Sequence, residues 1–169
     1  MSESSPASPI RVGFIGLSPS GWASKIIVPA LRAPVNSKLY RIVAVAGRTL
    51  ETAQAAATKY SEIVGHDVKA FGGQDCASQM ANDPDVDFVV VSVKTPNHLE
   101  VVMPVIDAGK PFFLEWPIGG NDADNIAGAA EAKGMKNMIG LHYKQILTLK
   151  KVSIVTRWYQ VMARPYLRL

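Results

Sequence analysis

The fold of this chain is decided by one stretch, Arg11 to Trp22, which reads R-V-G-F-I-G-L-S-P-S-G-W. A short apolar run ends in glycine and serine residues, and a segment of helical character, 23–32, follows at once. Two glycines of a G-x-G-x-x-G pattern are present as Gly16 and Gly21, with Ser18 at the middle position. In that pattern the glycines allow a tight turn, a close approach of backbone to phosphate, and close packing of helix on strand. The stretch predicts a strand–turn–helix unit that receives a phosphate group, although by itself it fits an ordinary glycine-rich turn equally well.

Length and composition indicate one globular domain. The chain has 169 residues, of which 48% are hydrophobic and 19% charged, which are ordinary values for a globular protein. The polar leader, 1–9, lacks an apolar segment and is not expected to be a secretory signal, and no run of about 18 apolar residues predicts a membrane span. One cysteine, Cys76, and three histidines favour a reducing, cytoplasmic setting and argue against a structural metal site.

The positive charge of the chain is concentrated at its C-terminal end, although the formal net charge of the whole is +4. Residues 1–144 carry 13 Lys and Arg against 14 Asp and Glu, a net charge of −1. Residues 145–169 carry 5 basic residues and no acid, a net charge of +5. A basic stripe over the folded body, the footprint of a nucleic-acid-binding protein, is therefore not indicated. We expect no direct contact with nucleic acid.

Apolar strand-like segments alternate with helical segments along residues 10–144. Strands separated by helices of about 10–15 residues predict an α/β fold, a Rossmann-type doubly wound parallel sheet in the order 3-2-1-4-5-6. The expected strands are Ile10 to Gly16, Tyr40 to Ala46, Val68 to Phe71, Asp87 to Val93, Pro111 to Glu115 and Asn137 to Leu141. The expected helices are Gly21 to Arg32, with a kink or end near Val28 because of Pro29, then Leu50 to Tyr60, Asp75 to Ala81, Pro96 to Ala108 and Asp122 to Lys133.

The residues that follow the strands are the candidate binding residues, because ligands of open parallel sheets bind beyond the carboxyl ends of the strands. Those ends are Ser18 to Gly21, Gly47 to Thr49, Lys94 to His98, Glu115 to Pro117 and His142 to Lys144. They predict a dinucleotide site, although loops also begin at strand ends for no functional reason. We expect contacts from Gly16, Ser18, Pro19, Ser20, Gly21, Trp22, Arg48, Thr49, Lys94, Thr95, Asn97, His98, Glu115 and Trp116.

The end of the second strand bears on the choice between NAD and NADP. An NAD-binding domain usually presents Asp or Glu there to the ribose hydroxyls, whereas this chain has Gly47 followed by Arg48 and Thr49. An arginine beside a hydroxyl suits a 2′-phosphate, which it can bind through two charge-assisted hydrogen bonds. The pattern favours NADP slightly over NAD. The alternative is a solvated arginine at the start of a helix.

The fourth strand leads into V-K-T-P-N-H-L-E and the fifth into G-K-P-F-F-L-E-W-P. These stretches resemble the glucose-fructose oxidoreductase / inositol dehydrogenase / MocA (Gfo/Idh/MocA) family of NAD(P)-dependent sugar oxidoreductases. Thr95-Pro96-Asn97 matches the T-P-N-x-x-H-type turn of that family, and Glu115 and Pro117 match the outer residues of its E-K-P motif. The resemblance covers about Ile10 to Lys144. It implies a dinucleotide-binding domain, which in complete members transfers a hydride between nicotinamide and a sugar- or polyol-like substrate.

The centre of the second motif departs from the family. Its lysine lies close to nicotinamide and substrate, where a positive charge helps to polarise the alcohol or carbonyl, and this chain has Trp116 instead. A tryptophan can stack on nicotinamide or fill core space. The pairs Glu115-Trp116 and Gly21-Trp22 resemble the fungal galactose-repressor branch, whose members bind a dinucleotide and act as regulators. In that alternative the chain has a protein partner and a nuclear location.

The second departure lies after Lys144, where the family continues into a substrate-binding α/β domain. Residues 145–155 are expected to form a linking helix with Ile146, Leu149 and Val152 on one face, and the rest of 145–169 is a basic tail. The tail fits a membrane-surface or partner-groove helix, or the remnant of a truncated chain. His98 and His142 have no carboxylate partner nearby in sequence, so we assign no catalytic residue. The open hypotheses are a cofactor domain with little turnover alone, a regulator, and a truncation product.

Overall fold

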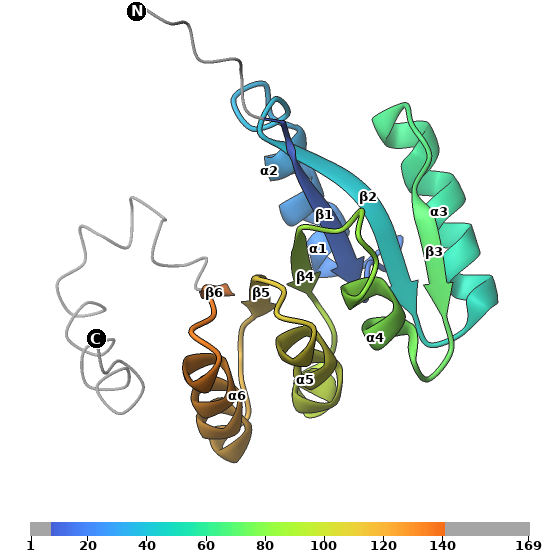
Figure 1. Cartoon of the computed structure of the whole chain (residues 1–169). Helices are drawn as coiled ribbons and strands as arrows, with labels where there is room; N and C mark the ends of the chain where they lie inside the picture. Colours follow the sequence, from blue (N-terminus) through green and yellow to red (C-terminus); the bar gives the residue numbers. More distant parts are fainter. Residues whose placement is uncertain (1–7, 141–169) are drawn as a thin grey trace, which may run out of the picture.

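The structure, a computed structural model, describes residues 8–140, and Figure 1 shows a central sheet with helices on both faces. The sheet is six-stranded and parallel throughout, in the order β3-β2-β1-β4-β5-β6, which confirms the predicted fold and order. The strands are β1 Ile10–Ile15, β2 Tyr40–Gly47, β3 Lys69–Gly72, β4 Phe88–Val91, β5 Phe112–Glu115 and β6 Asn137–Gly140. The helices are α1 Trp22–Lys25, α2 Ile27–Arg32, α3 Leu50–Val64, α4 Cys76–Ala81, η1 Thr95–Asn97, α5 His98–Asp107 and α6 Gly120–Ala132.

Predictions for 1–7 and 141–169 lie outside the described residues. They concern most of the polar leader, the strand end at His142 to Lys144, the linking helix and the basic tail. Within residues 8–140, no helix is long and apolar enough to cross a membrane.

Different helices cover the two faces of the sheet, because successive side chains of a strand point to opposite sides. On one face, Val12 and Phe14 of β1 belong to a core that includes residues of α2 and α3. On the other face, Ile15 of β1 and Val89 of β4 belong to a core built with α4, α5 and α6. The central strands β1 and β4 are therefore buried on both sides, as is typical of near-continuously apolar strands in a parallel sheet.

The first helix is two short helices rather than one. The sequence predicted a single helix with a kink or end near Val28, whereas the structure breaks it earlier, at Ile26, where ψ and φ leave the helical region. Pro29 is the physical reason: its ring collides with the carbonyl four residues earlier, and it lacks an N–H to donate. In the first turn of a new helix, α2, neither defect matters, so the break falls before the proline.

The third helix runs one turn beyond its predicted end. The sequence predicted an end at Tyr60, and α3 continues to Val64. Gly65 then adopts a left-handed conformation, with φ of +74°, and its N–H donates to the carbonyl of Ser61 at 2.9 Å. This is a common way for a helix to end at glycine. The extra turn carries α3 along the full height of the sheet, from the carboxyl edge to the amino edge (Figure 1).

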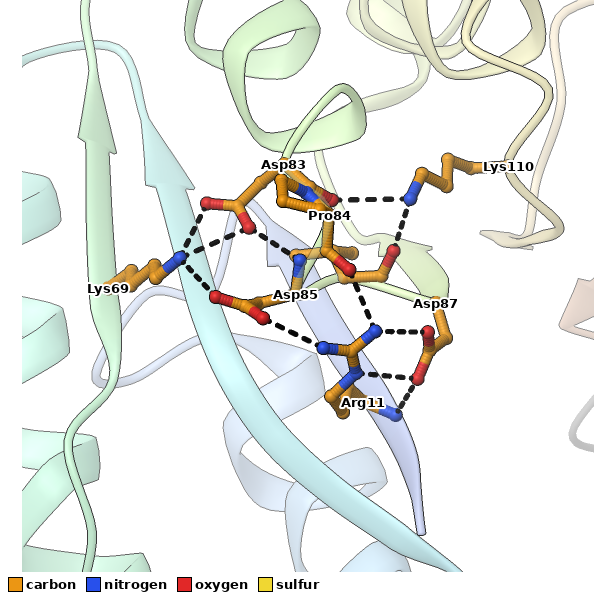
Figure 2. A network of polar contacts seen from close by, with 8 residues as sticks. Arg11, Lys69, Asp83, Pro84, Asp85, Asp87 and Lys110 are labelled. Atoms are coloured by element: carbon orange, nitrogen blue, oxygen red, sulfur yellow. Dashed lines mark hydrogen bonds and ion pairs between the residues drawn. The ribbon is translucent and has the colours of Figure 1, made fainter. Parts of the chain in front are cut away.

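A polar network joins the amino edge of the sheet, and Figure 2 shows it. Arg11, in β1, donates to both carboxylate oxygens of Asp87, at 3.0 and 2.8 Å, to Asp85 at 2.8 Å, and to the carbonyl of Pro84 at 2.7 Å. The backbone N–H of Arg11 also donates to Asp87, at 2.9 Å. This arginine lowers the pKa of the Asp87 carboxyl to about 2. The network fixes the turn before β4 against the start of β1.

Two lysines extend the same network to the neighbouring strands. Lys69, at the start of β3, contacts Asp83 and Asp85 at 2.8 and 2.7 Å. Lys110, before β5, donates to the backbone carbonyls of Asp83 and Val86. Four strands therefore contact one turn at their amino ends, on the side of the sheet opposite to the carboxyl edge.

Candidate functional site

The turn after β1 is locked to two other strands through Gly16. Its N–H donates to the carbonyl of Ala46 in β2 at 3.0 Å, and its φ is +87°. A Cβ at this position would lie 2.5 Å from the carbonyl oxygen of Ser92 and 2.6 Å from Cγ1 of Val93, both just after β4. Only glycine fits, both because φ is positive and because the backbone of β4 passes so close. The predicted glycine turn is therefore also a packing contact at the point where the strand order reverses.

The segment from Ser18 to Gly21 forms a tight and exposed turn. The N–H of Ser18 donates to Gly16 at 2.9 Å, and the N–H of Gly21 donates to Ser18 at 3.2 Å. The Ser18 hydroxyl accepts a bond from the N–H of Ser20 at 3.4 Å. A Cβ on Gly21 would lie 3.3 Å from the Cβ of Ser18, so the second glycine serves the close approach inside the turn. Ser18, Pro19 and Ser20 are exposed, and the N–H groups of Ser18, Ser20 and Gly21 already donate within the turn.

Lys59 is a residue at this turn that sequence reasoning missed. It projects from α3, and its Nζ donates to the carbonyl of Pro19 at 3.1 Å. The lysine lies 40 residues away in sequence and belongs to an ordinary polar helix face, so no local signal could have found it. It brings a positive charge beside the turn that the sequence predicts to receive a phosphate.

At the end of β2, the two predicted phosphate-binding residues differ in their surroundings. The Thr49 hydroxyl accepts a hydrogen bond from the N–H of Thr52 at 3.2 Å and lies 2.9 Å from the Thr52 hydroxyl, so it caps α3. Such a cap is a common role for threonine. Arg48 is exposed, and within residues 8–140 it forms no ion pair with a carboxylate. Arg48 is therefore the better placed of the two to meet an anion.

The ends of β4 and β5 are tied together by side chains. The Thr95 hydroxyl donates to the carbonyl of Pro117 at 3.0 Å, which joins the T-P-N turn to the E-W-P motif. The N–H of Asn97 donates to Lys94 at 2.9 Å and closes the turn. Lys94 itself is exposed. Two motifs that are separate in sequence thus form one wall beside the turn of β1.

His98 is a buried part of this wall. Its side chain is 1% exposed, and its Nε2 is bonded to the carbonyl of Val93 at 3.0 Å. Burial lowers the pKa of His98, although the negative charges of Asp122 and Glu115 act in the opposite direction. His98 therefore holds the strand end in place as a neutral ring, an arrangement that its position in the sequence did not reveal.

Glu115 and Trp116 point to different surroundings at the end of β5. Glu115 is 7% exposed, and a Cβ on Gly140 of β6 would lie 3.0 Å from its Oε1. Trp116 is 51% exposed. The carboxylate is thus enclosed between strand ends, while the indole stands in the open beside them. A stacking partner could reach Trp116 but not Glu115.

The structure brings most of the predicted residues to one edge. The turn of β1, the end of β4 and the end of β5 are in direct contact through Gly16 and Thr95, and Arg48 follows the neighbouring strand β2. Trp22 begins α1 directly after the turn and is 47% exposed. Among the described residues, no group of three His, Cys, Asp or Glu side chains is placed to hold a metal ion.

A parallel sheet that reverses its order between β1 and β4, with a glycine turn at that point, defines the class of dinucleotide-binding α/β domains. The comparison with known families gives the same class and makes it specific. Residues 10–141 match the model of the Gfo/Idh/MocA group, described as "Oxidoreductase family, NAD-binding Rossmann fold". The chain belongs to this family, and the described residues form its NAD-binding domain, as the two strand-end motifs predicted.

Two curated relatives of the chain are a dehydrogenase and a regulatory protein. Dehydrogenase aclE of Aspergillus oryzae is 37% identical over 151 residues, which cover 85% of this chain and 39% of that protein. The galactose/lactose metabolism regulatory protein GAL80 of Saccharomyces cerevisiae is 28% identical over 163 residues, covering 90% of this chain and 36% of that protein. The chain thus spans about two fifths of the length of the curated relatives it matches.

A solved structure supports the same relationship. The super-repressor mutant of Gal80p from Saccharomyces cerevisiae, Gal80(S0)-[G301R], superposes with a TM-score of 0.74 at 26% sequence identity. The match covers 89% of this chain and 39% of that one. The resemblance to the galactose-repressor branch, predicted from a few residues around two tryptophans, therefore extends over the whole fold.

Proposed function

We propose that the carboxyl edge of the sheet binds NADP or NAD, with the Gly16 to Gly21 turn at the pyrophosphate. The observation that carries this proposal is the contact of Gly16 with Ser92, which places the exposed turn beside the ends of β4 and β5. Family membership supports dinucleotide binding in general. The residues present suit the group: the turn exposes two serines, Lys59 adds a positive charge beside it, and no acidic side chain lies within Gly16 to Trp22.

In this proposal each strand end has its own task. Lys59 and the hydroxyls of Ser18 and Ser20 hold the pyrophosphate, because Pro19 supplies no N–H and the other N–H groups of the turn already donate within it. Arg48 meets the adenosine ribose and its 2′-phosphate, which favours NADP. Trp116 stacks on the nicotinamide, while Thr95 and His98 hold the neighbouring turn in place. The bound dinucleotide would supply hydride-transfer chemistry; the chain would supply orientation.

Titration with NADP and NAD, followed through tryptophan fluorescence, tests the proposal. Trp22 and Trp116 are both about half exposed, so a nucleotide bound beside them should quench their emission. Trp116→Phe should remove much of this signal. Failure of either nucleotide to bind at millimolar concentration would refute the proposal.

Arg48→Ala tests the preference for NADP. A hydrogen bond to a charged group contributes about 1.5–3 kcal/mol, so the variant should bind NADP about tenfold to a hundredfold more weakly and change NAD binding much less. Lys136→Ala is the matched control, because Lys136 is an exposed cation at the opposite edge and its loss should affect the two nucleotides equally. Equal losses in Arg48→Ala would remove the case for a 2′-phosphate contact.

A second candidate function is that of a dinucleotide-binding regulator, and Trp116 favours it. This exposed indole stands where the family motif has the lysine that polarises the reacting group, and a tryptophan cannot supply that charge. The likeness to GAL80, a regulatory protein, points in the same direction. A regulator would act on a protein partner and in the nucleus, whereas an enzyme would act on a sugar- or polyol-like alcohol in the cytoplasm. Measurable reduction of NADP or NAD by any of a panel of polyols would contradict the regulator, whereas binding without reduction is expected both of a regulator and of a cofactor domain alone.

A further inference from the structure

A cavity lies at the amino edge of the sheet, on the side opposite to the Gly16 to Gly21 turn. It is about half open to solvent, has a volume of about 390 Å³, and is lined by the end of α2, the start of β2 and the end of α3. This volume falls within the range of about 300–1,000 Å³ typical of small-molecule sites. The strands are parallel, so a ligand here would be separated from the dinucleotide edge by the height of the sheet (Figure 1).

The walls of the cavity combine apolar and basic side chains. Leu31, Ile63 and Val64 provide apolar surface, and Arg32, Arg41 and His66 line it as well. No Asp or Glu is among the lining residues. The apolar side chains would shelter the apolar part of a ligand, and the two arginines, which are exposed and always charged, would attract an anionic group. The lining therefore matches a small molecule that has both an apolar part and an anionic group.

His66 gives the cavity a fixed floor. Its Nε2 lies 2.8 Å from the carbonyl oxygen of Ile42 in β2. Ile42 lies opposite Val12 of β1, and β3 pairs with β2 only from Ala44 onward. This hydrogen bond to the backbone orients the ring of His66. A pre-formed wall costs a ligand less ordering on binding.

We propose that this cavity is a second binding site, for a small amphiphilic anion such as an aromatic or short aliphatic carboxylate. The site is independent of the dinucleotide site in composition and in location. The carboxylate meets Arg32 and Arg41 at the mouth, and the apolar part packs between Leu31 and Ile63. Its occupant is a small molecule, since a volume of about 390 Å³ has ample room for one aromatic acid.

Benzoate is the probe, with benzamide as its neutral analogue of nearly the same shape. We expect benzoate to bind the full-length chain with a dissociation constant on the order of 1 mM, as befits so small a ligand, and benzamide to bind at least tenfold more weakly. Saturation-transfer NMR measures both, and benzoate should shift the amide signals of residues 63–66. Addition of saturating NADP should leave the benzoate affinity unchanged.

Two variants separate charge from shape. Arg32→Ala/Arg41→Ala should weaken benzoate binding at least tenfold, whereas Lys38→Ala, an exposed cation in the same region that is not among the lining residues, should not. Ser37→Trp places a large side chain at an exposed lining position and should abolish binding without disturbing the core. Equal affinity for benzoate and benzamide, competition by NADP, or binding that Ser37→Trp leaves intact would overturn the proposal. Because NADP binding is measured separately, failure here leaves the dinucleotide site untouched.

Discussion

Replacing Gly16 with alanine should damage the fold and the candidate site together. The added Cβ would lie 2.5 Å from the carbonyl oxygen of Ser92 and 2.6 Å from Val93 Cγ1, distances that non-bonded atoms do not adopt. Alanine would also have to keep a φ of +87°. The positive φ costs about 1–2 kcal/mol, and forcing an extra carbon into a packed site costs about 1–3 kcal/mol. We therefore expect a loss of about 2–5 kcal/mol in the free energy of unfolding.

Gly65→Ala provides the control for this prediction. Gly65 also has a positive φ, +74°, but a Cβ there would meet nothing within 4 Å. This variant should lose only the conformational part, about 1–2 kcal/mol. The difference between the two variants isolates the collision with the backbone after β4.

Urea denaturation followed by circular dichroism measures both losses. A domain of this kind is stable by about 5–15 kcal/mol, so Gly16→Ala should unfold at distinctly lower urea concentration than Gly65→Ala, or fail to fold while the control folds. If it folds, its affinity for NADP should fall, because the clash pushes the turn away from Ser92. Equal stability of the two variants would refute the reasoning that the turn is a packing contact between strands.

Three further predictions concern the polar groups of the fold. Arg11 lowers the folded pKa of Asp87 to about 2 from 3.8, so the stabilisation by this ion pair is complete above about pH 4 and is lost as the pH falls towards 2. Because the pair is over a third exposed, the stabilisation amounts to no more than about 1 kcal/mol. Acid unfolding of Asp87→Asn should lack this loss of stability between pH 4 and 2. Burial lowers the pKa of His98 below 6.5, and in residues 8–140 its Nδ1 has no hydrogen-bond partner, so folding favours the neutral ring. The free energy of unfolding should therefore decrease as the pH falls below about 6.5. Urea unfolding at pH 5 and 7.5 measures this decrease, which should be smaller in His98→Gln; an equal decrease in the variant would contradict the role given to His98. Lys110→Met should cost about 3 kcal/mol or more, because its ammonium bonds two backbone carbonyls and each such charge-assisted bond contributes about 1.5–3 kcal/mol. Thermal melting checks this, with the exposed Lys136→Met expected to be neutral.

Much of the fold could be predicted from the sequence, because the signals are local. The run Phe88–Val91 is apolar without a break, and such a run is stable only when both faces are covered. Gly109 and Gly134 stand just after the ends of α5 and α6, both with positive φ. The right-handed connection of parallel strands then leaves few possible orders for the sheet, and the observed order is the predicted one.

The ends of the helices were harder to predict, because the residue that ends a helix can act on backbone several positions away. Pro29 announces a disturbance of the first helix, but the steric conflict falls on the carbonyl four residues earlier, so the break lies at Ile26 rather than near Val28. The end of α3 was placed at Tyr60, yet packing of Tyr60 in the core and the left-handed Gly65 carry the helix one turn further.

The sequence by itself determined which segments become strands and helices and which residues end at the carboxyl edge, because apolar periodicity, glycine and proline act within a few residues. The tertiary structure alone decided what meets there. Lys59 reaches the turn at Pro19, Thr95 bonds Pro117, and Gly16 lies against Ser92, all across strands or helices that are distant in sequence. Such contacts depend on the register and twist of the sheet, which no local pattern encodes. The glycine turn is therefore recognisable from the sequence, but its neighbours are set by the packing of the strands around it.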